Sequence, residues 1–227
     1  QLNDVWAAPT WSSIDWDLRW KPAHYEARRF FSPNFVVIFF NEQNDIEAYA
    51  INDRLENLKG VTVKIRVYAF DNNFEAIYEE HIQMDLEPYS SSPVHLGKIN
   101  NWKNSKNDLF LENLVFTADL IDVANKSLGF QSTIIPDKLY KINLGSTGDV
   151  TISSFKKISD LKYSLDIEAS GIAPLVWIEV MVDDLLAYFD DNAFTMTQST
   201  RTLILTLTKP FTRDLQLSDL YACSLKN

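Results

Sequence analysis

The residues best suited to chemistry stand at the very start of the chain. Asn3 and Asp4 are followed closely by Trp6 and Trp11. Amide and carboxylate groups beside aromatic rings are what proteins use to hold the hydroxyls and the apolar face of a pyranose. The alternative is that the tryptophans only pack the segment against a larger body. Asn3, Asp4 and Trp6 are therefore the candidate substrate-binding residues.

The first 31 residues hold four of the chain's six tryptophans. Apolar side chains recur at helical spacing from Trp20 to Phe31, with Pro22 suited to the first turn and Ser32-Pro33 suited to ending the helix. Glu26, Arg28 and Arg29 lie on the other side, so we expect one face to dock on an apolar surface. Because aromatic groups this dense need a large partner surface, we expect the chain to continue upstream of Gln1.

Other groups of reactive residues are interpreted as structural. The acidic pairs 79–80, 183–184 and 190–191 consist of neighbours that would point to opposite faces of a strand, so we interpret them as solvated charges or turn residues. A calcium loop at 190–192 lacks the required ligand spacing, and a turn is favoured. The three histidines have no metal-like spacing, and the six glycines form no phosphate-binding loop. We expect no metal and no cofactor.

Composition places the chain among ordinary globular proteins, with 46% apolar and 23% charged residues. Its net charge of −10 argues against a nucleic-acid or anionic-membrane partner, either of which needs clustered Lys and Arg. The longest apolar run, 35–40, is only long enough for a strand, so no membrane insertion is expected. Cys223 is the single cysteine and cannot form an internal disulfide.

From Phe35 onward the hydrophobic period changes to two. Apolar and polar residues alternate strictly over 61–67, which predicts a half-buried antiparallel strand. Short strands separated by polar turns predict β-sandwiches, and the segment 89–109, which contains Trp102, is interpreted as a long connection. The boundary between two sandwiches is placed at 135–144, where Pro136 and polar residues interrupt the pattern. Further candidate strands are 35–40, 47–52, 76–84 and 114–121, then 163–169, 176–180 and 202–207 in a second set that begins near 149.

Three segments of the sequence resemble a known family. Residues 1–33, QLNDVWAAPTWSSIDWDLRWKPAHYEARRFFSP, are similar to the end of the catalytic (β/α)8 barrel of family 2 glycoside hydrolases of the β-mannosidase type. The segments 170–177, SGIAPLVW, and 189–194, FDDNAF, followed by 200–202, resemble the C-terminal immunoglobulin-like domain of these enzymes. Between 34 and 140 the likeness rests mostly on position. The family commonly has Gly where this chain has Ala193.

The resemblance implies a mainly β fold in three parts. Residues 1–31 would be the last strand and helix of the catalytic TIM barrel, 32–140 an immunoglobulin-like β-sandwich, and 141–227 a C-terminal immunoglobulin-like β-sandwich. The barrel strand 1–4 would end at the active site. The two catalytic glutamates of a retaining mechanism would lie on earlier barrel strands, so no catalytic residue is expected in this segment and the segment alone is expected to be inactive.

The same resemblance implies what the complete protein does. It would remove single non-reducing terminal β-D-mannose residues from oligosaccharides of glycoproteins, binding the β-mannoside through the missing barrel. The missing N-terminal part is then the main partner, and homodimer contacts remain an expectation. The implied location is lysosomal, with secretion as the alternative. The sequon at Asn125 is compatible with either location.

Two other functions remain open on the residues alone. An accessory carbohydrate-binding module would need exposed aromatics on a sandwich face, for which Trp102 is the obvious candidate. An adhesive pair of immunoglobulin-like domains would leave the tryptophan-rich start unexplained. Saturable glycan binding by 32–227 favours the module, whereas an upstream adhesive repeat favours the adhesive pair.

Overall fold

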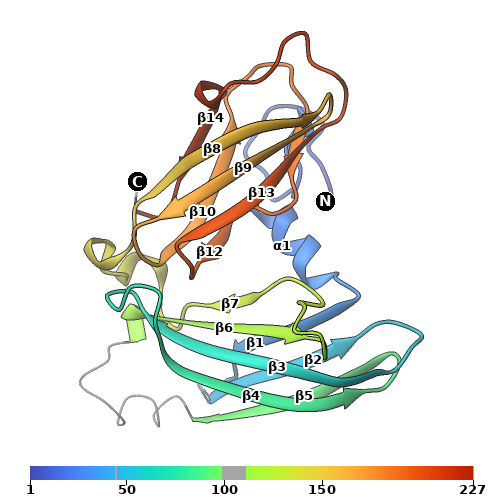
Figure 1. The fold of residues 1–227 in the computed structure, drawn as a ribbon, viewed down its shortest axis with the longest axis vertical. Coiled ribbons are helices and arrows are strands. Elements are labelled where there is room, and N and C mark those ends of the chain that lie inside the picture. Colours follow the sequence, from blue (N-terminus) through green and yellow to red (C-terminus); the bar gives the residue numbers. More distant parts are fainter. Residues whose placement is uncertain (44, 99–110, 227) are drawn as a thin grey trace. The chain divides into compact units, whose positions relative to one another are not determined.

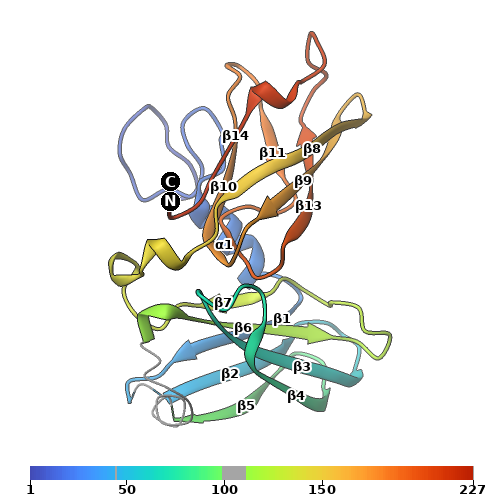
Figure 2. The same ribbon diagram turned by 60° about the vertical axis from the view of Figure 1, so that its left-hand side comes forward.

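The computed structural model describes residues 1–43, 45–98 and 111–226. The chain is mainly β and divides into two compact units. One contains residues 28–143, and the other combines residues 1–27 with residues 144–227. The N-terminal segment therefore belongs to the same compact unit as the second sandwich, although more than a hundred residues separate them in sequence. Figures 1 and 2 show the strands of each unit.

The 28–143 unit is a sandwich of two antiparallel sheets. Three strands in the order β1-β2-β5 form one sheet, and four strands in the order β4-β3-β6-β7 form the other. Short 3-10 turns at Leu111–Asn113 and Leu139–Lys141 accompany them. The strands are β1 (Asn34–Phe40), β2 (Asp45–Asn52), β3 (Leu58–Ala69), β4 (Ala76–Leu86), β5 (Ser90–Lys98), β6 (Leu114–Ile121) and β7 (Ser132–Ile134).

Period-two patterning explains how this first sandwich closes. Val61, Val63, Ile65 and Val67 of β3 are all buried, while the residues between them are half-buried on the other face. They join a core that includes buried residues of β1, β2 and β6. The predicted alternation at 61–67 is confirmed, and burying one apolar face of each sheet drives the two sheets together.

The second unit is also a sandwich. Its sheets have the strand orders β12-β10-β14 and β11-β13-β9-β8. Short 3-10 turns occur at Leu144–Ser146 and Leu217–Asp219. The strands are β8 (Val150–Ser159), β9 (Lys162–Ala169), β10 (Ala173–Val180), β11 (Ala187–Phe189), β12 (Phe194–Met196), β13 (Thr200–Leu207) and β14 (Leu220–Cys223).

Alternation again defines the core of the second sandwich. Leu165 and Ile167 of β9 and Leu203 and Leu205 of β13 are each at most 1% exposed. Strand β13 lies between β9 and β11, so its apolar face is central to the sheet. The mainly β fold with two immunoglobulin-like sandwiches is thus confirmed, whereas the assignment of residues 1–31 to a barrel stays a prediction.

The one α-helix in the described part of the chain, α1 (Pro22–Phe30), is shorter than the predicted 20–31 and docks through other side chains. Tyr25 and Arg29 are the buried residues of the helix, whereas Phe30 and Phe31 are exposed. The prediction that Arg29 lies on the polar face was therefore wrong. A tyrosine ring with a hydroxyl that accepts a hydrogen bond, and a long guanidinium side chain, can be buried when their polar atoms have partners.

The interpretation of 89–109 as one long connection was wrong in its first half. Residues 90–98 form β5, an edge strand beside β2. Its serine-rich start and Pro93 conceal a strand, because an edge position needs fewer backbone donors and little apolar surface. Trp102, the aromatic residue on which the binding-module alternative depends, lies outside the described residues. Among the described residues, no helix is long and apolar enough to cross a membrane.

Candidate functional site

The N-terminal segment is held by backbone bridges rather than by regular strands. Asn3 pairs with Ile14 in a parallel bridge, and Ile14 pairs with Trp20 in an antiparallel one. The Asp4 amide donates to the Ile14 carbonyl at 3.1 Å, and the Ile14 amide donates to the Leu2 carbonyl at 2.9 Å. Three stretches of the segment therefore lie side by side, with the first predicted site residues among them.

The Asp4 carboxylate is at the centre of this arrangement and is 2% exposed. It accepts a hydrogen bond from the Thr10 hydroxyl and a second from Lys21 Nζ at 2.9 Å. Lys21 also donates to Ser12 Oγ at 2.9 Å. The hydrogen bond from Thr10, followed by that from Lys21, lowers the pKa of Asp4 from 3.8 to about 2. Asp4 is thus a clamp that joins the start of the segment to the start of the helix.

The Asp4 clamp predicts an acid-sensitive segment. A carboxyl whose pKa falls on folding stabilises the folded state above its unfolded pKa of 3.8, and this contribution is lost as pH falls towards 2. We expect wild type to be more stable than Asp4→Asn at pH 6, and the difference to shrink between pH 4 and pH 2. Thermal unfolding of both variants across this range checks the prediction. An equal difference at pH 6 and pH 2 would contradict it.

The other two predicted site residues face outward within this unit. Asn3 is exposed, and its Nδ2 donates to the Asp4 carbonyl at 2.9 Å. Trp6 is 71% exposed, and Trp11 is 89% exposed. The structure therefore brings Asn3 and Asp4 together, with Asp4 turned inward and Asn3 and Trp6 turned to the surface.

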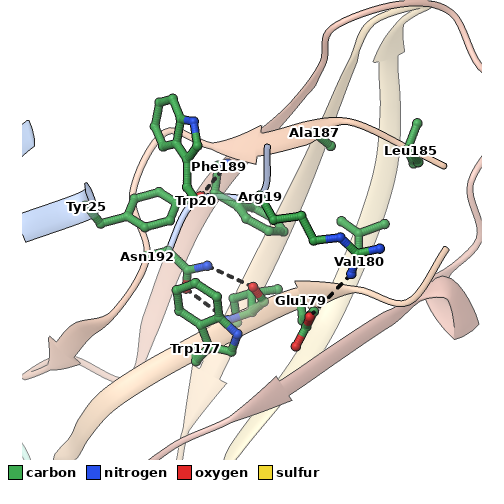
Figure 3. A pocket seen from close by; sticks show the side chains of 11 residues that line it. Arg19, Trp20, Tyr25, Trp177, Glu179, Val180, Leu185, Ala187, Phe189 and Asn192 are labelled. Carbon is green, nitrogen blue, oxygen red and sulfur yellow. Dashed lines mark hydrogen bonds and ion pairs between the residues drawn. The ribbon is translucent and has the colours of Figure 1, made fainter. Parts of the chain in front are cut away.

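An aromatic cluster attaches the segment to the second sandwich. The Trp20 ring stacks on Tyr188 of β11, with centroids 4.9 Å apart and planes inclined by 18°. Tyr25 meets Trp20 and Trp177 edge-on at 5.3 and 5.9 Å. The Tyr25 hydroxyl also accepts a hydrogen bond from the Phe189 amide at 3.2 Å. Figure 3 shows Trp20, Tyr25 and Trp177 around one small pocket.

That pocket has a volume of about 50 Å³ and combines aromatic walls with a charged rim (Figure 3). Arg19 and Glu179 form the rim, with Arg19 Nη1 3.7 Å from Glu179 Oε1. Asn192 lies at the base and bonds both backbone groups of Ile178, accepting from the amide at 2.9 Å and donating to the carbonyl at 2.8 Å. Its full lining is Arg19, Trp20, Tyr25, Trp177, Ile178, Glu179, Val180, Leu185, Ala187, Phe189 and Asn192.

The acidic pairs expected to be solvated or to form turns have different surroundings. Asp191 is 5% exposed and pairs with Arg201, whose guanidinium lies 3.9 Å from the centroid of the Phe194 ring. Of the two expected roles, solvated charge or turn residue, the first is wrong for Asp191, which lies buried in the bend between β11 and β12. Ala193 adopts a φ of 52°, the left-handed region that Gly enters without cost.

Glu79 is also paired. It bonds Arg66 Nε at 2.5 Å and His81 Nε2 at 2.8 Å, and the hydrogen bond from Arg66 lowers its pKa to about 2. Within the described part of the chain, no group of three or more His, Cys, Asp or Glu is arranged to hold a metal ion. In two of the acidic pairs one carboxylate is engaged by an arginine, Glu79 by Arg66 and Asp191 by Arg201.

Sequence reasoning missed the residues that receive the segment. Nothing in the sequence marked Trp177 and Tyr188 as contacts of the N-terminal segment, because an aromatic residue in a strand is ordinarily a core residue. The available clue was the cluster itself: an aromatic, isolated helix requires an aromatic or apolar surface elsewhere. Exposed Asn3 and Trp6, buried Asp4 and the cluster at Trp20 together form the candidate site.

Family comparisons cover most of the chain. A model described as a mannosidase Ig/CBM-like domain matches residues 44–139, and a mannosidase Ig-fold domain matches residues 148–227. The chain is 34% identical to a probable β-mannosidase of Caenorhabditis elegans over 229 residues, which is 100% of this chain and 24% of that protein. It is 27% identical to the β-mannosidase of Capra hircus, over 92% of this chain and 23% of that protein.

Solved structures agree on the fold. The β-D-mannosidase of Dictyoglomus thermophilum matches with a TM-score of 0.74 and 19% identity, over 99% of this chain and 25% of that one. The exo-chitosanase of Amycolatopsis orientalis matches with a TM-score of 0.67 and 15% identity, over 99% of this chain and 29% of that one. The chain spans about a quarter of the length of the relatives that it matches.

Proposed function

The chain belongs to the β-mannosidase family of glycoside hydrolases, and from this premise we propose that it is the non-catalytic C-terminal part of a retaining exo-β-mannosidase. The observation that carries the proposal is the similarity to the nematode protein, which extends over all of this chain. The complete protein would remove single terminal β-D-mannose residues from glycoprotein oligosaccharides. The two sandwiches would support the catalytic domain.

Residues 1–31 would be the last strand and helix of a catalytic (β/α)8 barrel. On that fold the C-terminal ends of the strands surround the active site, so Asn3 and Asp4 would lie at the edge of the sugar pocket. The exposed Asn3 side chain would form a hydrogen bond with a sugar hydroxyl through its amide. The exposed Trp6 ring would pack against the apolar face of the sugar. Asp4 would belong to the same edge and hold it in shape through Thr10 and Lys21.

The reaction itself requires two carboxyl groups about 5–5.5 Å apart, one as nucleophile and one as general acid/base. We place both glutamates outside this chain, on earlier strands of the barrel. Asp4 and Glu79 are poorly suited to the general-acid role, since each has a pKa of about 2 and could not hold a proton at neutral pH as a general acid must. This chain would therefore contribute binding contacts and support, and no catalytic residue.

Hydrolysis of p-nitrophenyl β-D-mannoside by the full-length protein tests the proposal. We expect the full-length protein to be active and residues 1–227 alone to be inactive. Asn3→Ala in the full-length protein should lower kcat/KM by about fivefold, since a hydrogen bond to the substrate contributes on the order of 1 kcal/mol. Asn73→Asp, on an exposed turn of the 28–143 unit, serves as the control. No activity on the β-mannoside, with activity on another β-glycoside, would refute the substrate.

We also propose a lysosomal location for the complete protein, with secretion as the alternative and a glycan on Asn125. Asn125 supports this because it lies in an exposed turn between β6 and β7, where Asp122 accepts hydrogen bonds from the Ala124 and Lys126 amides. An exposed sequon is accessible to the glycosylation machinery. A mass loss on enzymatic deglycosylation, absent in Asn125→Gln, would establish the glycan. A homodimer of the complete protein is part of the same proposal, and its molecular mass in solution decides it.

A further inference from the structure

The second sandwich makes a specific contact with the segment that carries the predicted substrate residues. Tyr188 offers its ring face to Trp20, and Trp177 meets the ring of Tyr25 edge-on. Aromatic pairs of this kind stabilise the fold by more than the burial of their apolar area alone would, and they fix the relative orientation of the two rings. The Phe189 amide adds a directional hydrogen bond to the Tyr25 hydroxyl at 3.2 Å.

Covalent and polar links continue from this cluster to the sugar-pocket edge. Trp20 is followed by Lys21, whose ammonium bonds the Asp4 carboxylate at 2.9 Å. The amide of Asp4 bonds the Ile14 carbonyl, and Ile14 is bridged to both Asn3 and Trp20. The position of Asn3 therefore depends on the orientation of Trp20 through two short connections, one through the backbone and one through the partly buried ion pair of Lys21 and Asp4.

We propose that Tyr188 and Trp177 of the second sandwich are positioning residues for the sugar-pocket edge, acting through Trp20, Lys21 and Asp4 on Asn3. This inference rests on the proposed function, and it assigns the C-terminal sandwich a role in substrate affinity beyond mechanical support. Neither residue touches the substrate. Tyr188 packs against the ring of Trp20 and Trp177 packs against the ring of Tyr25, and these two contacts fix the position of the segment.

A positioning role has a kinetic consequence that a structural role lacks. If a substitution merely unfolds part of the population, Vmax falls and the KM of the remaining molecules is unchanged. If the pocket edge moves in every molecule, contacts to the bound sugar weaken and KM rises. A displacement of 1 Å can reduce catalytic efficiency by about 100-fold, so the split between kcat and KM separates the two roles.

The test uses the full-length protein and p-nitrophenyl β-D-mannoside. We expect Tyr188→Ala to raise KM by about tenfold or more, and Tyr188→Phe, which keeps the stacking ring, to restore the wild-type KM. Tyr25→Phe removes only the hydroxyl that accepts from Phe189, so it should fold and raise KM in the same direction by less. The matched control is Phe155→Ala, because Phe155 stacks on Tyr163 within the same sandwich with centroids 5.0 Å apart.

Each outcome has one meaning. A raised KM in Tyr188→Ala and Tyr25→Phe, with unchanged KM in Phe155→Ala, supports positioning. Wild-type KM in both Tyr188→Ala and Tyr25→Phe overturns it while leaving the β-mannosidase activity intact. An equal rise in Phe155→Ala also overturns it, since the effect would then come from general destabilisation. An inactive wild-type protein instead refutes the proposed function, and the inference falls with it.

Discussion

Gly148→Ala is expected to destabilise the second sandwich by about 3 kcal/mol, because overpacking against rigid atoms costs roughly that much. A Cβ built on Gly148 would lie 2.3 Å from the Gly171 carbonyl oxygen and 2.5 Å from its nitrogen. These are backbone atoms, so they cannot move aside as the tip of a side chain could. The Gly148 amide also donates to the Ile172 carbonyl at 2.8 Å, and the clash would pull this bond apart.

The matched control for this prediction is the facing glycine. A Cβ on Gly171 would meet the Gly148 Cα at 3.5 Å, an ordinary van der Waals distance. Gly171→Ala should therefore cost less than about 1 kcal/mol. Hydrogen exchange in peptides from 150–207 measures the effect, and peptides from 61–67 in the other unit provide an internal reference. Equal losses in both variants would show that the clash is relieved by a backbone shift.

The strands of this chain could largely be predicted because their signal is local. The predicted strand 114–121 coincides with β6, and 61–67 lies inside β3, since strict alternation reports which face is buried. Strand β5 was missed because an edge strand needs no such alternation, and its Ser90-Ser91-Ser92-Pro93 start resembles a loop. Local pattern thus predicts central strands well and edge strands poorly.

The site could be predicted only in part, because its remaining contacts join distant parts of the chain. Asn3, Asp4 and Trp6 were proposed as binding residues from residue type alone, and their role stays a prediction. The inward turn of Asp4 depends on Lys21, and the burial of Asp191 depends on Arg201. Neither pairing has a periodic signature, since the partners come from separate strands or loops. A charged side chain can be buried only where a partner of opposite charge lies next to it, and the three-dimensional structure is needed to show which residues become neighbours.

Asn192→Ala is expected to cost about 3 kcal/mol, because it leaves two buried backbone groups without partners at about 1–3 kcal/mol each. Asn192 is 1% exposed, and its amide bonds both the N–H and the C=O of Ile178. Strand β10 pairs with β12 only as far as Val176, opposite Phe194. On the β12 side of β10, opposite β14, the Asn192 side chain therefore takes the place of a strand for the backbone groups of Ile178.

Asn192→Asp separates hydrogen bonding from side-chain volume. The carboxylate keeps an acceptor for the Ile178 amide but places a second oxygen where Nδ2 donated to the Ile178 carbonyl, so we expect it to destabilise at least as much as Ala. Gln198→Ala removes an exposed amide and should change stability by less than about 0.5 kcal/mol. Hydrogen exchange at Ile178 reports the loss directly. If this amide stays protected in both Asn192 variants, then water or a shifted strand satisfies β10 and the side chain is dispensable.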